Sequence, residues 1–371
     1  MLFHLFARLR TDVGLFNLFR YVSTRIALAT LTSLVITFAL APWFIRGARE
    51  RQLGEVIRED GPATHASKKG TPTMGGALIL LALVSATILW CDLTNPLVWP
   101  ALFVTVGYGA LGFVDDYLKI TKRNKKGVNA KTKLLVQFII GGIAVGWLFL
   151  GDAWDPAIRL RMSVPLMNFD RIPLEIPLVI YFLFGLVLVV MGTSNGVNLT
   201  DGLDGLAIGP VIICSFTFML LSYAAGQTLA GFNIAHYLGM AHVAGAGELA
   251  VFCGAIGGAG IGFLWFNTHP AQVFMGDVGA LALGGALGFV ALATKTELSL
   301  PVIGGVFVTE LVSDIIQVGY YKRTKKRIFL MAPIHHHFEK LGWPESRIVV
   351  RFWIVSFACA ILGLLLTLKV R

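Results

Sequence analysis

The amino-acid sequence predicts an all-α polytopic membrane protein with about ten transmembrane helices of about 20 residues each. Of its 371 residues, 56% are hydrophobic and only 14% are charged. Soluble domains contain about 45–50% apolar and about 25% charged residues, so this chain carries more apolar surface than one soluble core can bury. The mean hydropathy of +0.74 agrees. A soluble protein is therefore excluded.

The chain is predicted to form a single integral membrane domain over residues 1–371. Residues 1–23 mix Phe and Leu with spaced Arg and lack a small-residue cleavage site, which favours an interfacial amphipathic helix over a signal peptide. Ten apolar spans follow. They lie at residues 24–45, 74–91, 96–114, 133–150, 173–192, 203–224, 247–266, 279–295, 299–320 and 349–369.

The ninth predicted span differs from the others in two respects. Gly304 and Gly305 follow Pro301, so we expect this helix to bend there. It also carries Glu310 and Asp314, which are costly in hydrocarbon and usually face a cavity or the bundle interior. A bent helix at this place is expected to form a groove for a lipid substrate.

The distribution of Lys and Arg predicts the orientation of the chain. An even number of spans puts both termini on one side, and the five loops on the other side are predicted at residues 46–72, 115–132, 193–202, 267–278 and 321–348. The first, third and ninth loops hold 21 Lys and Arg when Lys133 and Arg351 at their edges are included, whereas the even-numbered loops hold four. The positive-inside rule therefore places these five loops in the cytoplasm and both termini outside. Four Arg near the N-terminus oppose this orientation.

The net charge of +10 is thus explained by topology, and no nucleic-acid partner is expected. The conspicuous polar motifs all fall in the five loops predicted to be cytoplasmic, which predicts one active site that faces the cytoplasm.

Five carboxylates are predicted to gather at this face. They are Asp115 and Asp116 in "GFVDDYLK", Asp201 and Asp204 in "NGVNLTDGLDGLA", and Asp277 in "FMGDVGA". Each has an ordinary alternative, because the first two can be a solvated helix end, while Asp201 and Asp277 can be helix N-caps. Asp201 and Asp204 are three residues apart and are expected on one face at the start of the sixth span.

Carboxylates beside lysines suit a phosphorylated substrate held with Mg²⁺, which takes oxygen ligands. The lysines of the same loops are expected to neutralise the charge of a diphosphate. They are Lys68, Lys69, Lys125 and Lys133. Phosphoryl transfer needs this combination because it depends on positioning and charge stabilisation.

The motif "PIHHHFE" contains three consecutive histidines, His335, His336 and His337. Three neighbouring side chains on a regular helix or strand cannot all face one ion, so a three-histidine zinc site is not expected. Histidine is also a poor ligand for Mg²⁺. Hydrogen bonds to phosphate are favoured over a surface loop that is merely rich in histidine.

At these residues the sequence resembles the phospho-N-acetylmuramoyl-pentapeptide transferase (translocase I) family, within the polyprenyl-phosphate N-acetylhexosamine-1-phosphate transferase superfamily. The resemblance covers essentially the whole chain. It implies a Mg²⁺-dependent transfer of phospho-N-acetylmuramoyl-pentapeptide from its UDP-activated form to undecaprenyl phosphate, giving lipid I and UMP in peptidoglycan synthesis. It further implies ten transmembrane helices in a bacterial inner membrane, external termini, a bent ninth helix and a homodimer.

The resemblance also implies roles for individual residues. Asp115, Asp116, Asp277 and His335 are expected to be catalytic, and Asp277 is expected to bind the Mg²⁺. The residues expected to bind the substrate are Lys69, Lys125, Lys133, Asn198, Asp201, Asp204, Asn267, Phe274, His336 and His337. Among them, Lys69, Asp204, Asn267 and Phe274 resemble the nucleoside pocket, where Phe274 offers a ring for uracil to stack on.

Two alternatives stay open at this point. A sister enzyme would transfer an N-acetylhexosamine 1-phosphate to a polyprenyl phosphate, and a transporter would line its pathway with membrane carboxylates. A transporter is disfavoured because the acids gather at one face and not at the midplane. The reaction itself proceeds either by direct attack of the lipid phosphate, which we favour, or through a phospho-aspartyl enzyme.

Overall fold

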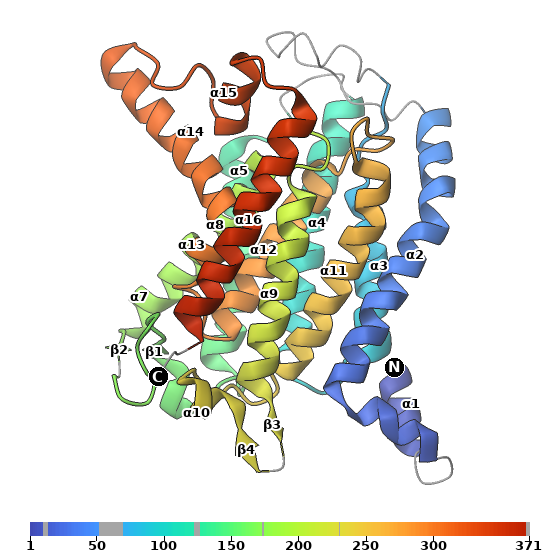
Figure 1. Cartoon of the computed structure of the whole chain (residues 1–371), viewed down its shortest axis with the longest axis vertical. Coiled ribbons are helices and arrows are strands. Elements are labelled where there is room, and N and C mark those ends of the chain that lie inside the picture. Colours follow the sequence, from blue (N-terminus) through green and yellow to red (C-terminus); the bar gives the residue numbers. More distant parts are fainter. Residues whose placement is uncertain (10–13, 52–69, 122–126, 173, 230, 369–371) are drawn as a thin grey trace.

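Eight helices in the described part of the chain are long and apolar enough to cross a membrane (Figure 1). The computed structural model describes residues 1–9, 14–51, 70–121, 127–172, 174–229 and 231–368. The eight are α2 (Val22–Glu50), α4 (Val98–Thr121), α5 (Ala130–Leu150), the continuous helix Leu178–Thr200, α9 (Ile208–Gly226), α11 (Gly247–Asn267), α12 (Gly276–Ala293) and α16 (Glu345–Thr367). The predicted all-α polytopic fold is confirmed.

The continuous helix Leu178–Thr200 consists of three segments, α7 (Leu178–Leu183), the π-helical η3 (Phe184–Met191) and α8 (Gly192–Thr200). The short helices elsewhere are α1 (Leu2–Leu9), η1 (Gly14–Arg20), α6 (Pro156–Arg159), α10 (Ile234–Leu238) and α15 (Ile334–Lys340). Two antiparallel hairpins pair β1 (Arg161–Met162) with β2 (Leu174–Glu175) and β3 (Thr228–Leu229) with β4 (Phe232–Asn233).

Two of the ten predicted spans correspond to shorter or broken helices. The span predicted at 74–91 contains α3 (Gly76–Trp90), which has 15 residues. The ninth is divided into α13 (Leu300–Ile303) and α14 (Gly305–Thr324). The break falls at Gly304, as predicted, and Figure 1 shows α14 leaning away from the other helices. The number of membrane crossings stays a prediction.

Several predicted boundaries are wrong in the described residues. The loops predicted at 115–132 and 193–202 begin inside helices, because α4 continues to Thr121 and α8 to Thr200. Hydropathy ends a span at its first polar residues, whereas a helix that is paired on its polar side continues. The segment 1–23 forms two short helices, α1 and η1, in place of one.

Two central helices, α11 and α12, form the core of the bundle. Nearly all of α12 is buried, and so is most of α11, because both consist largely of Gly and Ala. Small residues let helix backbones approach closely in membrane proteins. A Cβ on Gly258 of α11 would lie 2.1 Å from the carbonyl oxygen of Thr30, and one on Gly76 of α3 would lie 2.0 Å from the amide nitrogen of Gly279. The glycines therefore set the helix spacing.

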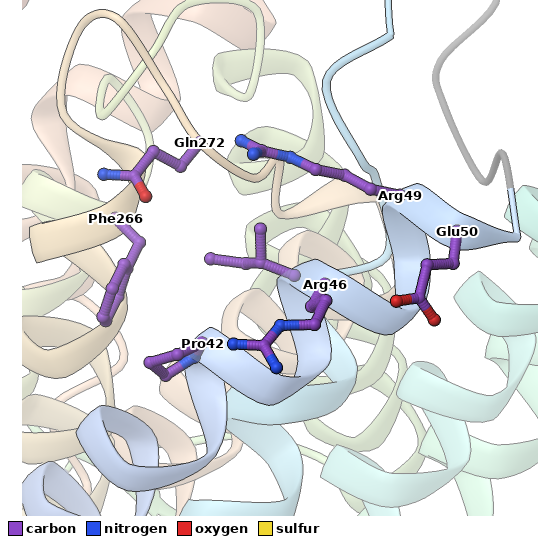
Figure 2. Close-up of a pocket in the computed structure, with 7 residues that line it drawn as sticks. Pro42, Arg46, Arg49, Glu50, Phe266 and Gln272 are labelled. Carbon is purple, nitrogen blue, oxygen red and sulfur yellow. The ribbon is translucent and has the colours of Figure 1, made fainter.

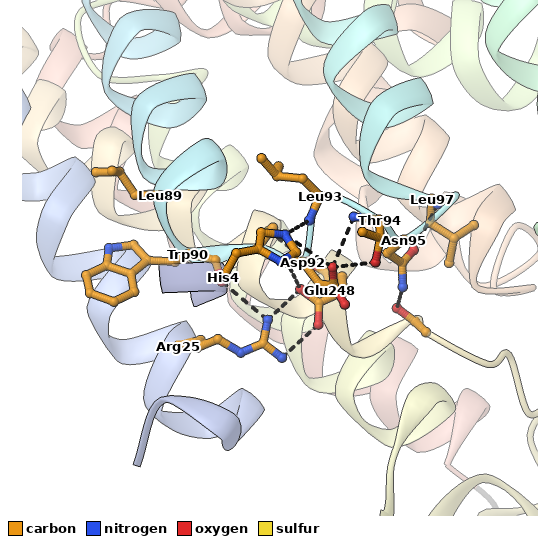
Figure 3. A network of polar contacts seen from close by, with 12 residues as sticks. His4, Arg25, Leu89, Trp90, Asp92, Leu93, Thr94, Asn95, Leu97 and Glu248 are labelled. Atoms are coloured by element: carbon orange, nitrogen blue, oxygen red, sulfur yellow. Dashed lines mark hydrogen bonds and ion pairs between the residues drawn. The ribbon is translucent and has the colours of Figure 1, made fainter. Parts of the chain in front are cut away.

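A buried ion pair joins α2 and α11. Arg25 of α2 donates from Nη1 to Glu248 Oε2 at 2.6 Å and from Nη2 to Glu248 Oε1 at 2.7 Å (Figure 3). The backbone amide of Asp92 donates to Glu248 Oε2 at 2.7 Å. Buried charges are stable only when they are paired and hydrogen-bonded. This pair ties α2 and α11 to the end of α3.

A second buried charge lies between α12 and α13. The Lys295 ammonium donates to the Arg159 carbonyl at 3.0 Å and to the Tyr181 hydroxyl at 3.3 Å. It also lies 3.4 Å from the centre of the Trp154 ring, a cation–π distance. The Tyr181 hydroxyl donates to Glu297. Burial lowers the pKa of Lys295 to about 7 and raises that of Glu297 to about 6.

Different structural elements lie at the two ends of the bundle. One end carries α15, the last turns of α2, α4 and α8 and the first turn of α12, and we refer to it as the α15 end (Figure 1). The other end carries both hairpins, α1 and α10, and both labelled ends of the chain lie toward it (Figure 1). The predicted functional residues therefore gather toward the α15 end.

Candidate active site

The crossing of α4 and α12 positions the central acids. Gly112 lies on α4 one turn before Asp115 and Asp116, and a Cβ on it would lie 2.2 Å from the carbonyl oxygen of Asp277. A larger residue at 112 would push the two helices apart. Gly276 has a φ of 70°, the left-handed region that favours glycine, and it turns the chain into α12.

Asp277 is not the N-cap of α12. The helix begins at Gly276 with Met275 as its N-cap residue, so Asp277 occupies the first turn. An acid in that turn is favoured by the helix dipole. Asp115 and Asp116 lie within α4 and not at its end, which removes the solvated helix end as their explanation. Their exposed fractions are 1% and 5%.

The carboxylates of Asp115, Asp116 and Asp277 form one cluster, in which an oxygen from each lies within 4.8 Å of the others. Lys119 Nζ lies 2.6 Å from Asp115 Oδ2, 3.6 Å from Asp116 Oδ1 and 3.1 Å from Asp277 Oδ2. Lys133 Nζ lies 2.7 Å from Asp277 Oδ2 and 3.2 Å from Asp115 Oδ2. Two ammonium groups thus offset three negative charges.

Hydrogen bonds from neighbouring elements fix the orientation of each carboxylate. Asn198 of α8 donates from Nδ2 to Asp277 Oδ1 at 2.8 Å. The Val128 amide donates to Asp115 Oδ1 at 2.7 Å, and the Val278 amide donates to Asp116 Oδ2 at 3.3 Å. The cluster therefore joins α4, α5, α8 and α12 at one point.

A second polar cluster lies at the α8–α9 connection. Asp204 Oδ2 accepts from the Ala271 amide at 3.0 Å and lies 3.1 Å from His269 Nδ1, and the Asp204 amide donates to Glu345 Oε1 at 2.7 Å. Asn267 accepts from the Gly205 amide at 3.0 Å. The structure thus brings the predicted residues Asp204 and Asn267 together.

The segments around this second cluster have irregular backbone. Residues 201–207 are turns and α9 begins only at Ile208, so the placement of Asp201 and Asp204 on one face of a helix is wrong. Gly205 has a φ of 77°, which interrupts the helix there. Phe274 lies in the loop 268–275, where its amide donates to the Pro72 carbonyl at 2.8 Å.

The three histidines of α15 point to three different partners. His335 is 1% exposed, and its Nδ1 lies 3.1 Å from Glu310 Oε2 of α14. His336 Nδ1 lies 2.6 Å from Glu339 Oε2, and His337 Nδ1 accepts from the Leu330 amide at 3.2 Å. These three contacts thus involve three different residues, Glu310, Glu339 and Leu330.

His335 also meets the α8–α9 connection. A Cβ on Gly202 would lie 2.2 Å from His335 Nε2, so only glycine fits beside the imidazole. Glu310 was expected to face a cavity or the bundle interior, and it is fully buried against His335. The dyad of Glu310 and His335 therefore fastens α14 and α15 to the segment that carries Asp201 and Asp204.

Sequence reasoning missed three residues of these clusters, Lys119, His269 and Glu345. Lys119 could have been predicted from the sequence, because it follows Asp116 by three residues and Asp115 by four, and such residues share one face of a helix. His269 and Glu345 meet Asp204 only through the fold, so no local pattern marks them. The predicted Lys68, Lys69 and Lys125 lie outside the described residues.

Comparison with known proteins assigns the chain to a family. The family model of glycosyl transferase family 4 matches residues 98–295, and signature 1 of phospho-N-acetylmuramoyl-pentapeptide-transferase matches residues 68–80. The phospho-N-acetylmuramoyl-pentapeptide-transferase of Sorangium cellulosum is 53% identical over 98% of both chains. Those of Granulibacter bethesdensis and Desulfatibacillum aliphaticivorans are 54% and 52% identical over 100% of both chains.

The chain belongs to the phospho-N-acetylmuramoyl-pentapeptide-transferase family. The resemblance predicted from the acidic and histidine motifs is therefore confirmed. The matched region 98–295 contains Asp115, Asp116 and Asp277, and it also contains Asp204 and Asn267. The first polar cluster thus lies within the matched region, and so does the second apart from Glu345.

The donor set of the first cluster fits a magnesium ion in this family member. Asp115, Asp116 and Asp277 offer carboxylate oxygens close enough to share one small cation, and the described cluster contains no sulfur or imidazole ligand. Mg²⁺ prefers oxygen ligands and is usually bound through one or two carboxylates with phosphate oxygens and water. Lys119 and Lys133 now hold the same oxygens.

Proposed function

We propose that the protein transfers phospho-N-acetylmuramoyl-pentapeptide from its UDP-activated form to undecaprenyl phosphate, giving lipid I and UMP for peptidoglycan synthesis. Relatives that bear the transferase name and match at about half identity over the full chain support this. The observation that carries the proposal is the cluster of Asp115, Asp116 and Asp277 with Lys119 and Lys133, between helices that cross a membrane. Such a cluster suits a diphosphate next to a lipid acceptor.

We infer direct attack by the lipid phosphate. A phosphate oxygen of the acceptor attacks the β-phosphorus of the UDP-sugar, the bond from that phosphorus to the bridging oxygen breaks, and UMP leaves with the oxygen. Asp277 is held by Lys119, Lys133 and Asn198. This environment supports a charged, fixed carboxylate, which is the property of a metal ligand and less that of an attacking group.

Of the two α4 carboxylates, that of Asp116 is the better placed to act as the base that accepts a proton from the lipid phosphate. Asp115 is engaged by Lys119, Lys133 and the Val128 amide, whereas Asp116 Oδ1 has Lys119 at 3.6 Å. A weakly engaged carboxylate is the more available base. Mg²⁺ bound by the acids would neutralise charge on the diphosphate. Lys119 and Lys133 would then turn toward phosphate oxygens.

The remaining roles are proposals of the same kind. We propose that Lys69, Asp204, Asn267 and Phe274 bind the nucleoside, which the meeting of Asp204 with Asn267 supports. Lys125, Asp201, His336 and His337 are proposed to contact other parts of the substrate. We also propose ten crossings of the bacterial inner membrane, a cytoplasmic α15 end, external termini and a homodimer.

Transfer of label from nucleotide to lipid tests the reaction. Purified protein is incubated with radiolabelled UDP-N-acetylmuramoyl-pentapeptide, undecaprenyl phosphate and Mg²⁺, and we expect label in the organic phase with release of UMP. UDP-N-acetylglucosamine is expected to give no product. Product from UDP-N-acetylglucosamine alone would favour the sister enzyme.

The variant Asp277→Ala tests the central acid. It is expected to lower the rate by at least about 100-fold, the usual cost of losing one preorganised charge contact. Asp170→Ala is the control, because Asp170 is exposed and pairs with His236 at the hairpin end. Turnover by folded Asp277→Ala at the rate of the control would falsify the role of Asp277.

A further inference from the structure

A pocket of about 340 Å³ lies at the α15 end of α2, outside both polar clusters. Its walls come from the last turns of α2 and from the end of α11 with the loop that follows. The lining residues are Pro42, Ile45, Arg46, Arg49, Glu50, Phe266 and Gln272. Figure 2 shows the side chains of Arg46 and Arg49 on one side of the space, with Phe266 and Gln272 across from them.

Two cationic side chains border the pocket. Arg46 and Arg49 are both exposed, and neither guanidinium has an ion-pair partner among the described residues. Figure 2 shows the guanidinium of Arg49 toward Gln272 and that of Arg46 toward Pro42, with the carboxylate of Glu50 on the far side of Arg46. Guanidinium groups bind phosphate through paired N–H donors and are less strongly hydrated than ammonium groups. Each of the two is therefore a candidate contact for a phosphate group at the pocket.

The pocket also has apolar walls. Pro42, Ile45 and Phe266 line it, and Ile45 is only 6% exposed. A soluble anion would leave this apolar surface unused. A ligand that carries a phosphate at one end and hydrocarbon at the other would contact both the guanidiniums and the apolar side chains.

The surroundings of the pocket lie at the depth of a membrane interface. Trp43 on α2 is 75% exposed and Trp265 on α11 is 67% exposed, and both stand beside lining residues. Exposed tryptophans are enriched at the headgroup level of a bilayer. Further along α2, Leu31 and Val35 are 55% and 61% exposed and continue the apolar surface. The pocket therefore opens where hydrocarbon meets headgroups.

We propose that this pocket binds an anionic membrane phospholipid, with Arg46 or Arg49 on the phosphate and with Phe266, Pro42 and Ile45 against the glycerol and the first acyl carbons. The proposal rests on the membrane fold and the charge of the pocket, and it does not depend on the proposed reaction. Because the Gln272 amide donates to the Phe266 carbonyl at 2.8 Å, a bound lipid would also contact the loop 268–275.

Native mass spectrometry of the full-length protein in detergent tests the proposal. Dioleoyl phosphatidylglycerol and dioleoyl phosphatidylcholine are added at equal concentrations, and the bound fraction of each is measured. We expect the wild type to retain phosphatidylglycerol in preference. Arg46→Ala with Arg49→Ala is expected to bind it at least about tenfold more weakly, because charged hydrogen bonds are lost.

Arg51→Ala is the matched control, because Arg51 is an exposed arginine at the same helix end that does not line the pocket. It is expected to retain the lipid as the wild type does. If the double variant does not fold, Arg46→Gln alone removes one exposed charge and is expected to give a smaller loss in the same direction.

Three outcomes would overturn the proposal. One is equal retention of the two lipids by the wild type, and another is equal loss in Arg51→Ala and the double variant. The third is displacement of the lipid by millimolar inorganic phosphate, which would identify the ligand as a phosphate from solution. Preferential retention of phosphatidylglycerol that survives inorganic phosphate and depends on Arg46 and Arg49 supports it.

Discussion

At the scale of single residues, Lys119 is the side chain on which the acidic cluster depends most. Its ammonium lies within 3.6 Å of all three carboxylates, whereas Lys133 reaches two of them. Three acids gathered in a partly buried site repel one another unless cations stay among them. Lys119 therefore holds the acids together before any substrate arrives.

We predict that Lys119→Met lowers kcat by about 100-fold, because it removes a cation aimed at the charge that develops on phosphate. Steady-state assay of lipid product measures this. Lys131→Met is the control, since Lys131 is exposed two residues before Lys133 on α5. Full activity of Lys119→Met would show that Lys133 and Mg²⁺ suffice.

Glu310 is a positioning residue for His335. Its carboxylate lies against His335 Nδ1, which leaves Nε2 directed at Gly202. We predict that Glu310→Gln lowers kcat at least about tenfold, because a charged hydrogen bond that orients the ring is lost. The KM for the nucleotide is expected to change less, which separates this effect from loss of binding.

The control for Glu310→Gln is Asp314→Asn, one turn further along α14. It is expected to leave kcat near the wild-type value. A kcat of Glu310→Gln equal to that of the wild type would contradict a positioning role for Glu310.

At the scale of elements, the connection between α12 and α13 is expected to respond to pH. Burial lowers the pKa of Lys295 to about 7 in the folded protein, against an ordinary 10.5. Between these values the unfolded chain binds the proton and the folded chain does not, so the free energy of unfolding rises with pH. The stability gained by deprotonation of Lys295 is fully present above pH 10.5 and is lost as the pH falls through about 7.

We predict that the free energy of unfolding of the wild type rises relative to that of Lys295→Met when the pH is raised from about 7 to about 9. The upper limit of this rise is about 1.4 kcal/mol for each pH unit, and the Tm of the wild type rises with it. Thermal unfolding in detergent measures it. Lys340→Met, at an exposed lysine, should follow the wild type. A constant or falling difference would show that Lys295 keeps an ordinary pKa.

Some of the helices could be predicted from the sequence, and some of their features could not. The spans were predictable because about 20 apolar residues are required to cross a bilayer. The bend at Gly304 followed from its glycines and the nearby Pro301. The continuation of α4 past Asp116 was not predictable from hydropathy, because it depends on pairing with Lys119 and Lys133.

At the scale of the whole molecule, the five acids were predicted to share one face, and the structure places four of them in two separate clusters. Asp115, Asp116 and Asp277 meet because Gly112 lets α4 touch α12. Asp204 turns instead to His269 and Glu345. Those partners lie 65 and 141 residues away along the chain, so a motif could not reveal them.

The orientation of the whole molecule in the membrane can be tested by labelling. We predict that a membrane-impermeant maleimide added to intact spheroplasts labels Leu229→Cys at the hairpin end and does not label Lys340→Cys at the α15 end. Both positions are exposed, and the native cysteines are buried or half-buried. Labelling of Lys340→Cys alone would reverse the proposed orientation.

The ion pair of Arg25 and Glu248 has a consequence for biosynthesis. The ribosome delivers Arg25 223 residues before its partner. At about 5–20 residues per second, the guanidinium waits roughly 10–45 s for Glu248. An unpaired arginine resists entry into hydrocarbon, so the earliest segment stays hydrated at the translocon or the bilayer edge until the later one emerges. Assembly of the N-terminal third is thus completed only late in translation.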